Sequence, residues 1–150
     1  MLSQKTRYTI RALQHLADTF GQGSVRLDTI AEAQKIPRKF LTVILSEMAR
    51  EGIVVSHRGR DGGYELALPP VDIRYGDIIR LSRGSLALVP CASRNAYETC
   101  ANCLPEAECR LRGLMLKLRD ETAAMLDRIT LADAIAVEAP FDLLDEALHV

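Results

Sequence analysis

Apolar residues recur at intervals of three and four over the first third of the chain, which is the spacing of amphipathic helices. We predict a first helix that Ser3 caps, that extends to Phe20 and that Gly21 ends. A second, shorter helix is predicted over residues 29–34, with Asp28 as its cap. The residues expected to face the core from these two helices are Tyr8, Ala12, Leu13, Leu16, Ala17, Phe20, Ile30 and Ala33.

A third helix is predicted to begin at Pro37 and to end at Gly52, because proline suits the first helical turn and glycine often follows the last one. A short helix, a tight turn and a second helix in this order are typical of a helix-turn-helix. The apolar positions of the third helix are Phe40, Leu41, Ile44, Leu45 and Met48.

The hydrophobic period then changes from that of a helix to that of strands. Residues 53–57 and 64–68 each predict a strand, and the glycine-rich segment 58–63 predicts the loop between them. A hairpin directly after a helix-turn-helix is a winged helix. The pattern therefore predicts a winged helix-turn-helix DNA-binding module over residues 1–70, mainly α-helical with a small β-hairpin wing.

In the second half, we expect a fourth helix over residues 72–81, a long helix over about 110–129 and a short helical piece over 130–135. The long helix has an apolar stripe of about five turns, which a small domain does not cover alone. We therefore predict a homodimer that forms through the 110–129 helix. Together with the segment before it, this helix makes up a second unit over residues 71–136, and 137–150 is expected to be an acidic, mobile tail.

Composition and charge narrow the class of protein. A hydrophobic share of 48% is enough for a core, and no apolar run approaches the roughly 18 residues that span a bilayer. Charges interrupt the N-terminal segment, so no secretory signal is expected, and we predict a cytoplasmic protein with no membrane partner. The net charge of −1 combines a basic front half with an acidic rear half, which weakly favours nucleic-acid binding by the front module.

The candidate DNA contacts lie on the third helix and in the wing. Arginine and lysine pair well with guanine, threonine donates or accepts a hydrogen bond, and glycines let a backbone approach DNA closely. The alternatives are that these are ordinary solvated charges, or that the module docks another protein instead of DNA. The candidates are Arg38, Lys39, Thr42, Arg58, Gly59, Arg60, Gly62 and Gly63.

An enzyme is not predicted. No nucleophile is paired with a base in a recognisable motif. A thiol oxidoreductase built on Cys100 and Cys103 would need a βαβ context, which the pattern does not predict.

All four cysteines of the chain lie within 19 residues: Cys91, Cys100, Cys103 and Cys109. Four thiolates are enough for a tetrahedral zinc site or for an iron–sulfur cluster. Paired as disulfides, they would act as a redox switch. The spacing alone leaves zinc, iron–sulfur and plain thiol chemistry open.

The chain resembles the Rrf2 family of bacterial transcription regulators. The segment RGRDGGYEL (58–66) is similar to that family's wing signature, LSQKTRYTIRALQHLA (2–17) to its first helix, and 30–54 to its helix-turn-helix. A cysteine loop, a long helix and the TLADAI segment (130–135) complete the resemblance. It implies a dimeric repressor or activator on an inverted-repeat operator. In many members an iron–sulfur cluster alters DNA affinity, while other members lack the cluster and act with protein partners.

The resemblance also indicates which residues would bind an iron–sulfur cluster. Cys91, Cys103 and Cys109 best match the family's three cysteines, so Cys100 is additional. Where one branch of the family has a histidine three residues after the last cysteine, this chain has Arg112.

Other branches complete the cluster with an acidic residue near the start of the first helix, where this chain has Arg7. We therefore predict Cys100 as the fourth protein ligand of a [2Fe–2S] or [4Fe–4S] cluster, with zinc as the alternative metal. Binding or losing the cluster would order or release the loop and change the spacing of two recognition helices. The predicted function is a dimeric regulator whose operator affinity is switched at this loop.

Overall fold

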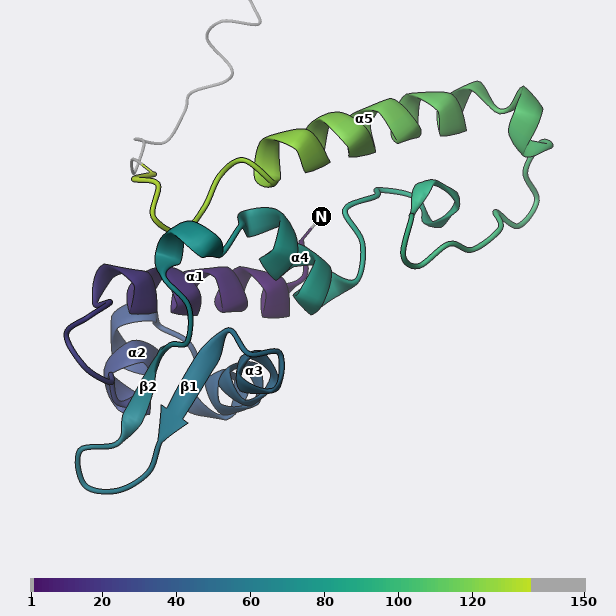
Figure 1. Ribbon diagram of the computed structural model, residues 1–150. Coiled ribbons are helices and arrows are strands. Elements are labelled where there is room, and N and C mark those ends of the chain that lie inside the picture. Colours follow the sequence, from purple (N-terminus) through teal and green to yellow (C-terminus); the bar gives the residue numbers. More distant parts are fainter. Residues whose placement is uncertain (1, 136–150) are drawn as a thin grey trace, which may run out of the picture.

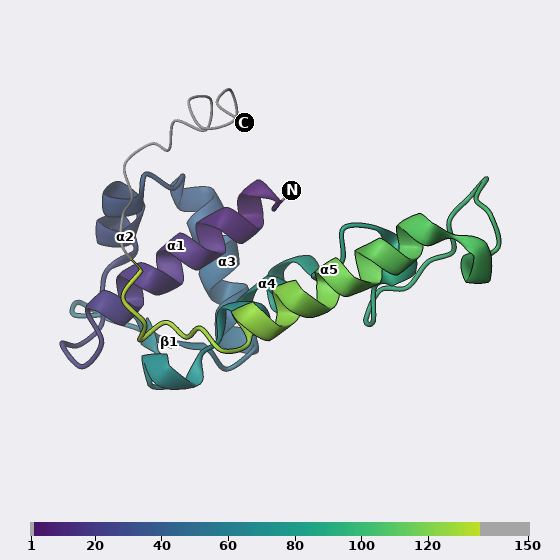
Figure 2. The ribbon, with the colours of Figure 1, turned by 90° about the horizontal axis from the view of Figure 1, so that it is seen from above.

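The computed structural model of the protein describes residues 2–135. Helix α4 packs on α1, and α5 extends away from the other helices, with the segment 90–109 running back along it (Figures 1 and 2). The short 3₁₀ turns are Pro70–Asp72, Pro90–Ala92 and Glu106–Glu108. In chain order the main elements are α1 (Gln4–Asp18), α2 (Leu27–Gln34), α3 (Arg38–Arg50), β1 (Val54–His57), β2 (Gly63–Leu66), α4 (Tyr75–Arg83) and α5 (Arg110–Leu126).

One hydrophobic core joins the first four helices and the hairpin, and this arrangement confirms the predicted winged helix-turn-helix. The core continues beyond the hairpin, because Ile73, Ile78 and Leu131 pack into it as well. None of the side chains of α5 is buried. The largest fully buried apolar residues are Leu13, Leu16, Ile30, Leu41, Ile44, Leu45, Met48, Ile73 and Ile78.

Helix α1 begins as predicted and ends early. The Ser3 hydroxyl accepts a hydrogen bond from the backbone N–H of Thr6 at 3.1 Å, which confirms the cap. The prediction that the helix extends to Phe20 is wrong, since its last residue is Asp18 and the Phe20 side chain is exposed. The Thr19 hydroxyl donates to main-chain carbonyls of the last turn, a competing local bond that suits a helix end.

The predicted cap of α2 is also wrong. The helix begins at Leu27 with Arg26 at the cap position, so Asp28 lies inside the first turn, where its negative charge still suits the helix dipole. The prediction that Ala33 faces the core is also wrong, since Ala31 is the alanine of this helix that is buried and Ala33 is exposed.

Helix α3 buries four of the five apolar residues that its spacing predicted. The exception is Phe40, which is exposed and packs edge-on against the Tyr8 ring with the ring centroids 6.4 Å apart. The helix itself starts at Arg38, with Pro37 as the residue before it.

The wing is a two-stranded antiparallel hairpin in which Val54 lies opposite Leu66 and His57 opposite Gly63. Residue Val25 adds a β-bridge to Tyr64, so the segment before α2 lies alongside the hairpin. Both strands are shorter than predicted, but the hairpin and its position directly after α3 agree with the sequence pattern.

Two predictions for the second half need correction. Helix α4 begins at Tyr75 instead of Asp72, because the prolines before it start a 3₁₀ turn. The predicted helical piece over 130–135 is wrong: Thr130 forms a β-bridge with Arg74, and the Leu131 N–H donates to the Ile73 carbonyl at 2.9 Å. This pairing returns the chain to the core after α5.

Helix α5 ends at Leu126, three residues before the predicted end. The predicted acidic tail, 137–150, lies outside the described residues. No helix within residues 2–135 is long and apolar enough to cross a membrane.

Candidate functional site

The three candidate DNA contacts on α3 lie at its N-terminal end and are exposed. The Arg38 guanidinium pairs with the Asp28 carboxylate at 2.8 Å. The Thr42 hydroxyl donates to the Arg38 carbonyl at 2.9 Å, which leaves its oxygen able to accept. Within residues 2–135, Lys39 forms no ion pair, so it presents an unshared positive charge.

The loop of the wing extends past the helices at the lower edge of Figure 1. Arg58 and Arg60 are exposed in this loop, and neither belongs to an ion pair of the described part of the chain. At the base of the loop, the His57 Nε2 atom lies 2.7 Å from a Glu65 carboxylate oxygen. The Ser24 hydroxyl donates to the Asp61 carbonyl at 3.1 Å and ties the loop to the segment before α2.

The glycines of the wing have a role inside the hairpin. Gly59 has a φ of +103°, a conformation that side chains other than glycine rarely adopt. A Cβ atom on Gly63 would collide with the Val25 backbone, and one on Gly62 would collide with the His57 carbonyl. These residues are therefore required for the shape of the loop, a role that the sequence analysis did not assign to them.

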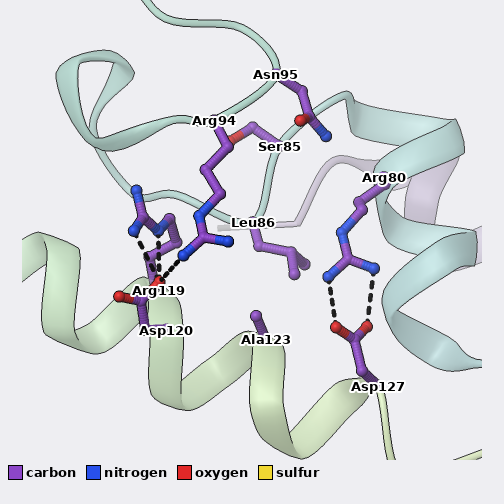
Figure 3. A pocket seen from close by; sticks show the side chains of 9 residues that line it. All are labelled: Arg80, Ser85, Leu86, Arg94, Asn95, Arg119, Asp120, Ala123 and Asp127. Carbon is purple, nitrogen blue, oxygen red and sulfur yellow. Dashed lines mark hydrogen bonds and ion pairs between the residues drawn. The ribbon is translucent and has the colours of Figure 1, made fainter.

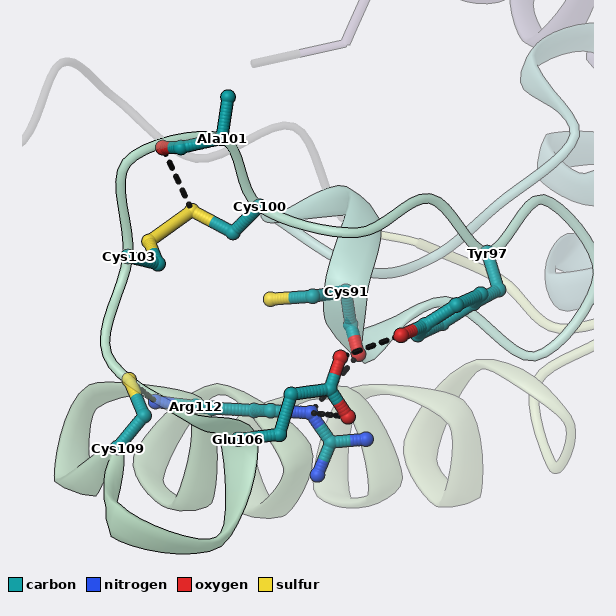
Figure 4. Close-up of a disulfide and its surroundings, with 8 residues drawn as sticks. All are labelled: Cys91, Tyr97, Cys100, Ala101, Cys103, Glu106, Cys109 and Arg112. Atoms are coloured by element: carbon teal, nitrogen blue, oxygen red, sulfur yellow. Dashed lines mark hydrogen bonds and ion pairs between the residues drawn. A yellow bond between two sulfur atoms is a disulfide. The ribbon is translucent and has the colours of Figure 1, made fainter.

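All four cysteines line one cavity of about 260 Å³ beside the start of α5 (Figure 4). Cys91 is buried in the turn Pro90–Ala92, and Cys109 caps α5, its sulfur accepting from the Arg112 N–H at 3.4 Å. The cavity wall between the cysteines is largely apolar, with Val89, Pro90, Leu104 and Leu111.

Two of the four cysteines are covalently paired. Cys100 and Cys103 form an exposed disulfide, with their Cα atoms 5.6 Å apart, while Cys91 and Cys109 are free thiols. In the described range, no group of three or more potential ligands is arranged to hold a metal ion. The predicted ligands thus share one cavity but are not drawn together into a coordination shell. Four sulfur donors around a cavity of this size fit a cluster in composition once the disulfide is reduced.

Arg112 is one of two arginines of α5 that hold the cavity to this helix. Its Nε atom donates to the Cys91 carbonyl at 3.1 Å and lies 3.3 Å from a Glu106 carboxylate oxygen. The same carboxylate accepts a hydrogen bond from the Tyr97 hydroxyl, and this bond raises the pKa of Tyr97. From the sequence, position 112 is notable only because an arginine stands where one branch of the family has a histidine. Its charge gave no sign of the carbonyl contact.

A second arginine of α5 holds the same turn. Arg119, two helical turns after Arg112, donates from Nη1 to the Ala92 carbonyl at 2.6 Å. Its remaining donors bind the Asp120 carboxylate, which also accepts from Arg94, and these bonds lower the pKa of Asp120. The turn that contains Cys91 is therefore attached to α5 at two successive carbonyls.

Helix α5 is in turn attached to α4 at a polar cavity of about 400 Å³ (Figure 3). Arg80 of α4 donates two hydrogen bonds to the Asp127 carboxylate, both at 2.8 Å. These bonds raise the pKa of Arg80 and lower that of Asp127. Gly76 lies under this pair, since a Cβ atom there would collide with the Asp127 carboxylate. The contact connects the DNA-binding core to the helix that carries the cysteine loop.

Comparison with known proteins places this arrangement in a family. The sequence profile of Rrf2, described as an iron-dependent transcriptional regulator, matches residues 2–137. An Rrf2-like HTH-type transcriptional regulator of Rhodobacter capsulatus is 36% identical over 143 residues, which cover 93% of this chain and 95% of the relative.

Solved structures agree with the sequence relatives. CymR, the global cysteine regulator of Bacillus subtilis, matches with a TM-score of 0.73 and 32% identity over 89% of this chain and 94% of that chain. IscR of T. potens matches with a TM-score of 0.69 and 32% identity, over 89% and 84% of the two chains. These relatives are regulators of transcription, which confirms the predicted non-enzymatic role. The chain belongs to the Rrf2 family of DNA-binding transcription regulators.

Proposed function

We propose that the protein is a homodimeric regulator that binds an inverted-repeat operator and whose DNA affinity is set by the state of the cysteine loop. One observation carries this proposal: all four cysteines line a single cavity that is attached to α5. A chemical change in that cavity acts directly on the helix that joins the loop to the DNA-binding core.

Helix α3 and the wing are the proposed DNA-binding surface. In other helix-turn-helix proteins the N-terminal residues of the recognition helix contact base edges. The exposed charges of Lys39, Arg58 and Arg60 support this role, since phosphate contacts supply most of the affinity for duplex DNA. The full proposed contact set is Arg38, Lys39, Thr42, Arg58, Gly59, Arg60, Gly62 and Gly63.

The proposed ligands of an iron–sulfur cluster are Cys91, Cys100, Cys103 and Cys109. The description of the family as iron-dependent favours iron over zinc, and four thiolates match the donors of [2Fe–2S] and [4Fe–4S] clusters. When bound, such a cluster supplies one-electron redox chemistry and a covalent link between the two sides of the cavity. Leu104 and Leu111 line this cavity and would lie beside the cluster.

A second candidate, a thiol–disulfide switch without metal, is favoured by the Cys100–Cys103 disulfide. Both of these thiols are exposed, which suits reaction with an oxidant in solution. The two candidates use the same cavity and differ only in what joins the sulfurs.

Helix α5 is the proposed dimer contact. An apolar stripe along it is exposed in the single chain, and a second copy of the same helix would remove it from water. The stripe consists of Leu111, Leu114, Leu118 and Met125. Residues 1–70 then form the DNA-binding module and 71–136 the sensing and dimerisation unit, with Arg80 and Asp127 as one connection between α4 and α5.

Anaerobic purification followed by iron, sulfide and zinc analysis and a visible spectrum tests the cluster. We expect iron with acid-labile sulfide and a brown colour in the wild type, and loss of both in Cys100→Ala. Stoichiometric zinc without iron would show that the cysteines hold a structural zinc ion and would overturn the proposed cluster. Absence of metal, with a reversible Cys100–Cys103 disulfide by mass spectrometry, would support the thiol switch.

A further inference from the structure

The exposed face of α3 contains an apolar residue at its centre, Val43. A helix turns by about 100° per residue, so positions separated by four, three and four residues lie in one line along it. The line directly opposite the buried residues of α3 is formed by Lys39, Val43, Ser46 and Arg50, all exposed.

Two of the exposed side chains of α3 that flank this line make contacts within the protein. Arg38 lies towards one side of the line and shares its charge with Asp28. On the other side, Phe40 packs against the Tyr8 ring. The Val43 side chain is 53% exposed, although its branched apolar surface would be more stable out of water.

The charges around Val43 identify the kind of surface that would cover it. Lys39 precedes it by one helical turn and Arg50 follows it by two, and neither forms an ion pair among residues 2–135. Their Cα atoms are about 16 Å apart along the helix axis, so a helix that lies in a major groove has a long basic side chain on either side of Val43 that can reach a phosphate group. Val43 and Ser46 then face the floor of the groove, where the base edges lie.

We propose that Val43 is a specificity-determining residue that contacts the 5-methyl group of a thymine in the major groove. The inference rests on the proposed DNA binding by α3 and adds a base to it. Thymine is the one standard base that presents an apolar group in this groove, and cytosine has only hydrogen at the equivalent carbon. Val43 therefore distinguishes a T·A pair from a C·G pair by contact alone, without a hydrogen bond.

Deoxyuridine tests the proposal because it removes only the methyl group of thymine. Duplexes selected from a random library by the full-length protein are synthesised again with one thymine at a time replaced by deoxyuridine. Losing one buried methyl group is expected to weaken wild-type binding about fourfold at the contacted thymine. In Val43→Ala the same replacement is expected to have no effect, since the two changes remove the same contact.

Val71→Ala is the matched control, because Val71 is also exposed (60%) but lies in the turn Pro70–Asp72. This variant should keep the fourfold sensitivity at the contacted thymine. The protein could bind duplex DNA in a salt-dependent way and yet show no thymine at which deoxyuridine weakens wild-type binding but not binding by Val43→Ala. That result would overturn this inference alone. Failure to select any duplex would overturn the proposed DNA binding, and the inference with it.

Discussion

Asp127 connects the DNA-binding core to α5 through the two hydrogen bonds that it accepts from Arg80. A Cβ atom at position 76 would displace the Asp127 carboxylate from its present position, and the contact lies at the end of α5 opposite the cysteine cavity. The Asp127 carboxylate is thus one of several contacts that hold this end of α5 on the core, together with the packing of Leu126 and Ile129. The bonds from Arg80 lower the pKa of Asp127 in the folded protein.

Asp127→Asn is expected to lower the free energy of unfolding by about 1 kcal/mol at pH 7, the upper end for a partly exposed ion pair. Because the folded pKa lies below the unfolded value of about 3.9, this contribution is present above pH 4 and is lost as the pH falls through the folded pKa. Urea unfolding at pH 7 and pH 3 measures it. Asp61→Asn, at an exposed loop carboxylate, is the control, and an equal loss at both pH values would refute the assignment.

Gly63 lies where two segments of backbone approach each other closely. An added methyl group would collide with the Val25 backbone, so we expect Gly63→Ala to destabilise the protein by about 1–3 kcal/mol, as overpacking does. Gly113→Ala provides the comparison: nothing lies near its Cβ position in α5, and alanine should raise helix stability by about 0.5–1 kcal/mol. The change in melting temperature of each variant measures these effects. Equal changes for Gly63→Ala and Gly113→Ala would contradict the close packing at Gly63.

At the scale of elements, the sequence predicted those features that depend on local spacing. The buried faces of α1 and α3 followed from intervals of three and four, and the wing followed from the change of period at residue 53. Tertiary contacts accompany two of the failures, while the early end of α1 and the late start of α4 have local causes. The bridge between Val25 and Tyr64 lies directly before α2, whose cap is Arg26 instead of Asp28, and the bridge between Arg74 and Thr130 replaced a predicted helix.

The candidate site likewise has features that could be predicted from the sequence and features that could not. That the cysteines share one cavity could be expected from their closeness in sequence. The contacts of Arg112 and Arg119 with the carbonyls of Cys91 and Ala92 span 21 and 27 residues, and carbonyl groups are present at every position. No side-chain pattern could therefore identify these two arginines as the attachment of the loop.

The apolar stripe of α5 gives a prediction for the whole element. Replacing both Leu114 and Leu118 by glutamate should convert a dimer into a monomer, because the charges would be buried against a second copy of the helix. Sedimentation velocity measures the change. Ala124→Glu, exposed on a different face of α5, should leave the dimer intact. A dimer that survives the double substitution would show that another surface joins the two chains.

For the whole molecule, the described contacts form one continuous connection from the cysteine cavity to the DNA-binding core. The cysteine cavity is held to α5 by Arg112 and Arg119, and α5 is held to α4 by Asp127. Helix α4 packs on α1, and α1 packs on α3. In the proposed dimer, we expect a change in how the sulfurs are joined to alter the placement of α3 relative to the second copy, and with it the fit to two half-sites.

The affinity of one selected duplex for the same protein sample in two states tests this account most directly. One aliquot is kept anaerobic and reduced, with its metal content measured, and the other is oxidised until the Cys100–Cys103 disulfide is complete. The account predicts that the two dissociation constants differ at least fivefold, within the usual range of allosteric coupling, and that Cys100→Ala abolishes the difference. Equal dissociation constants in the two states would contradict it.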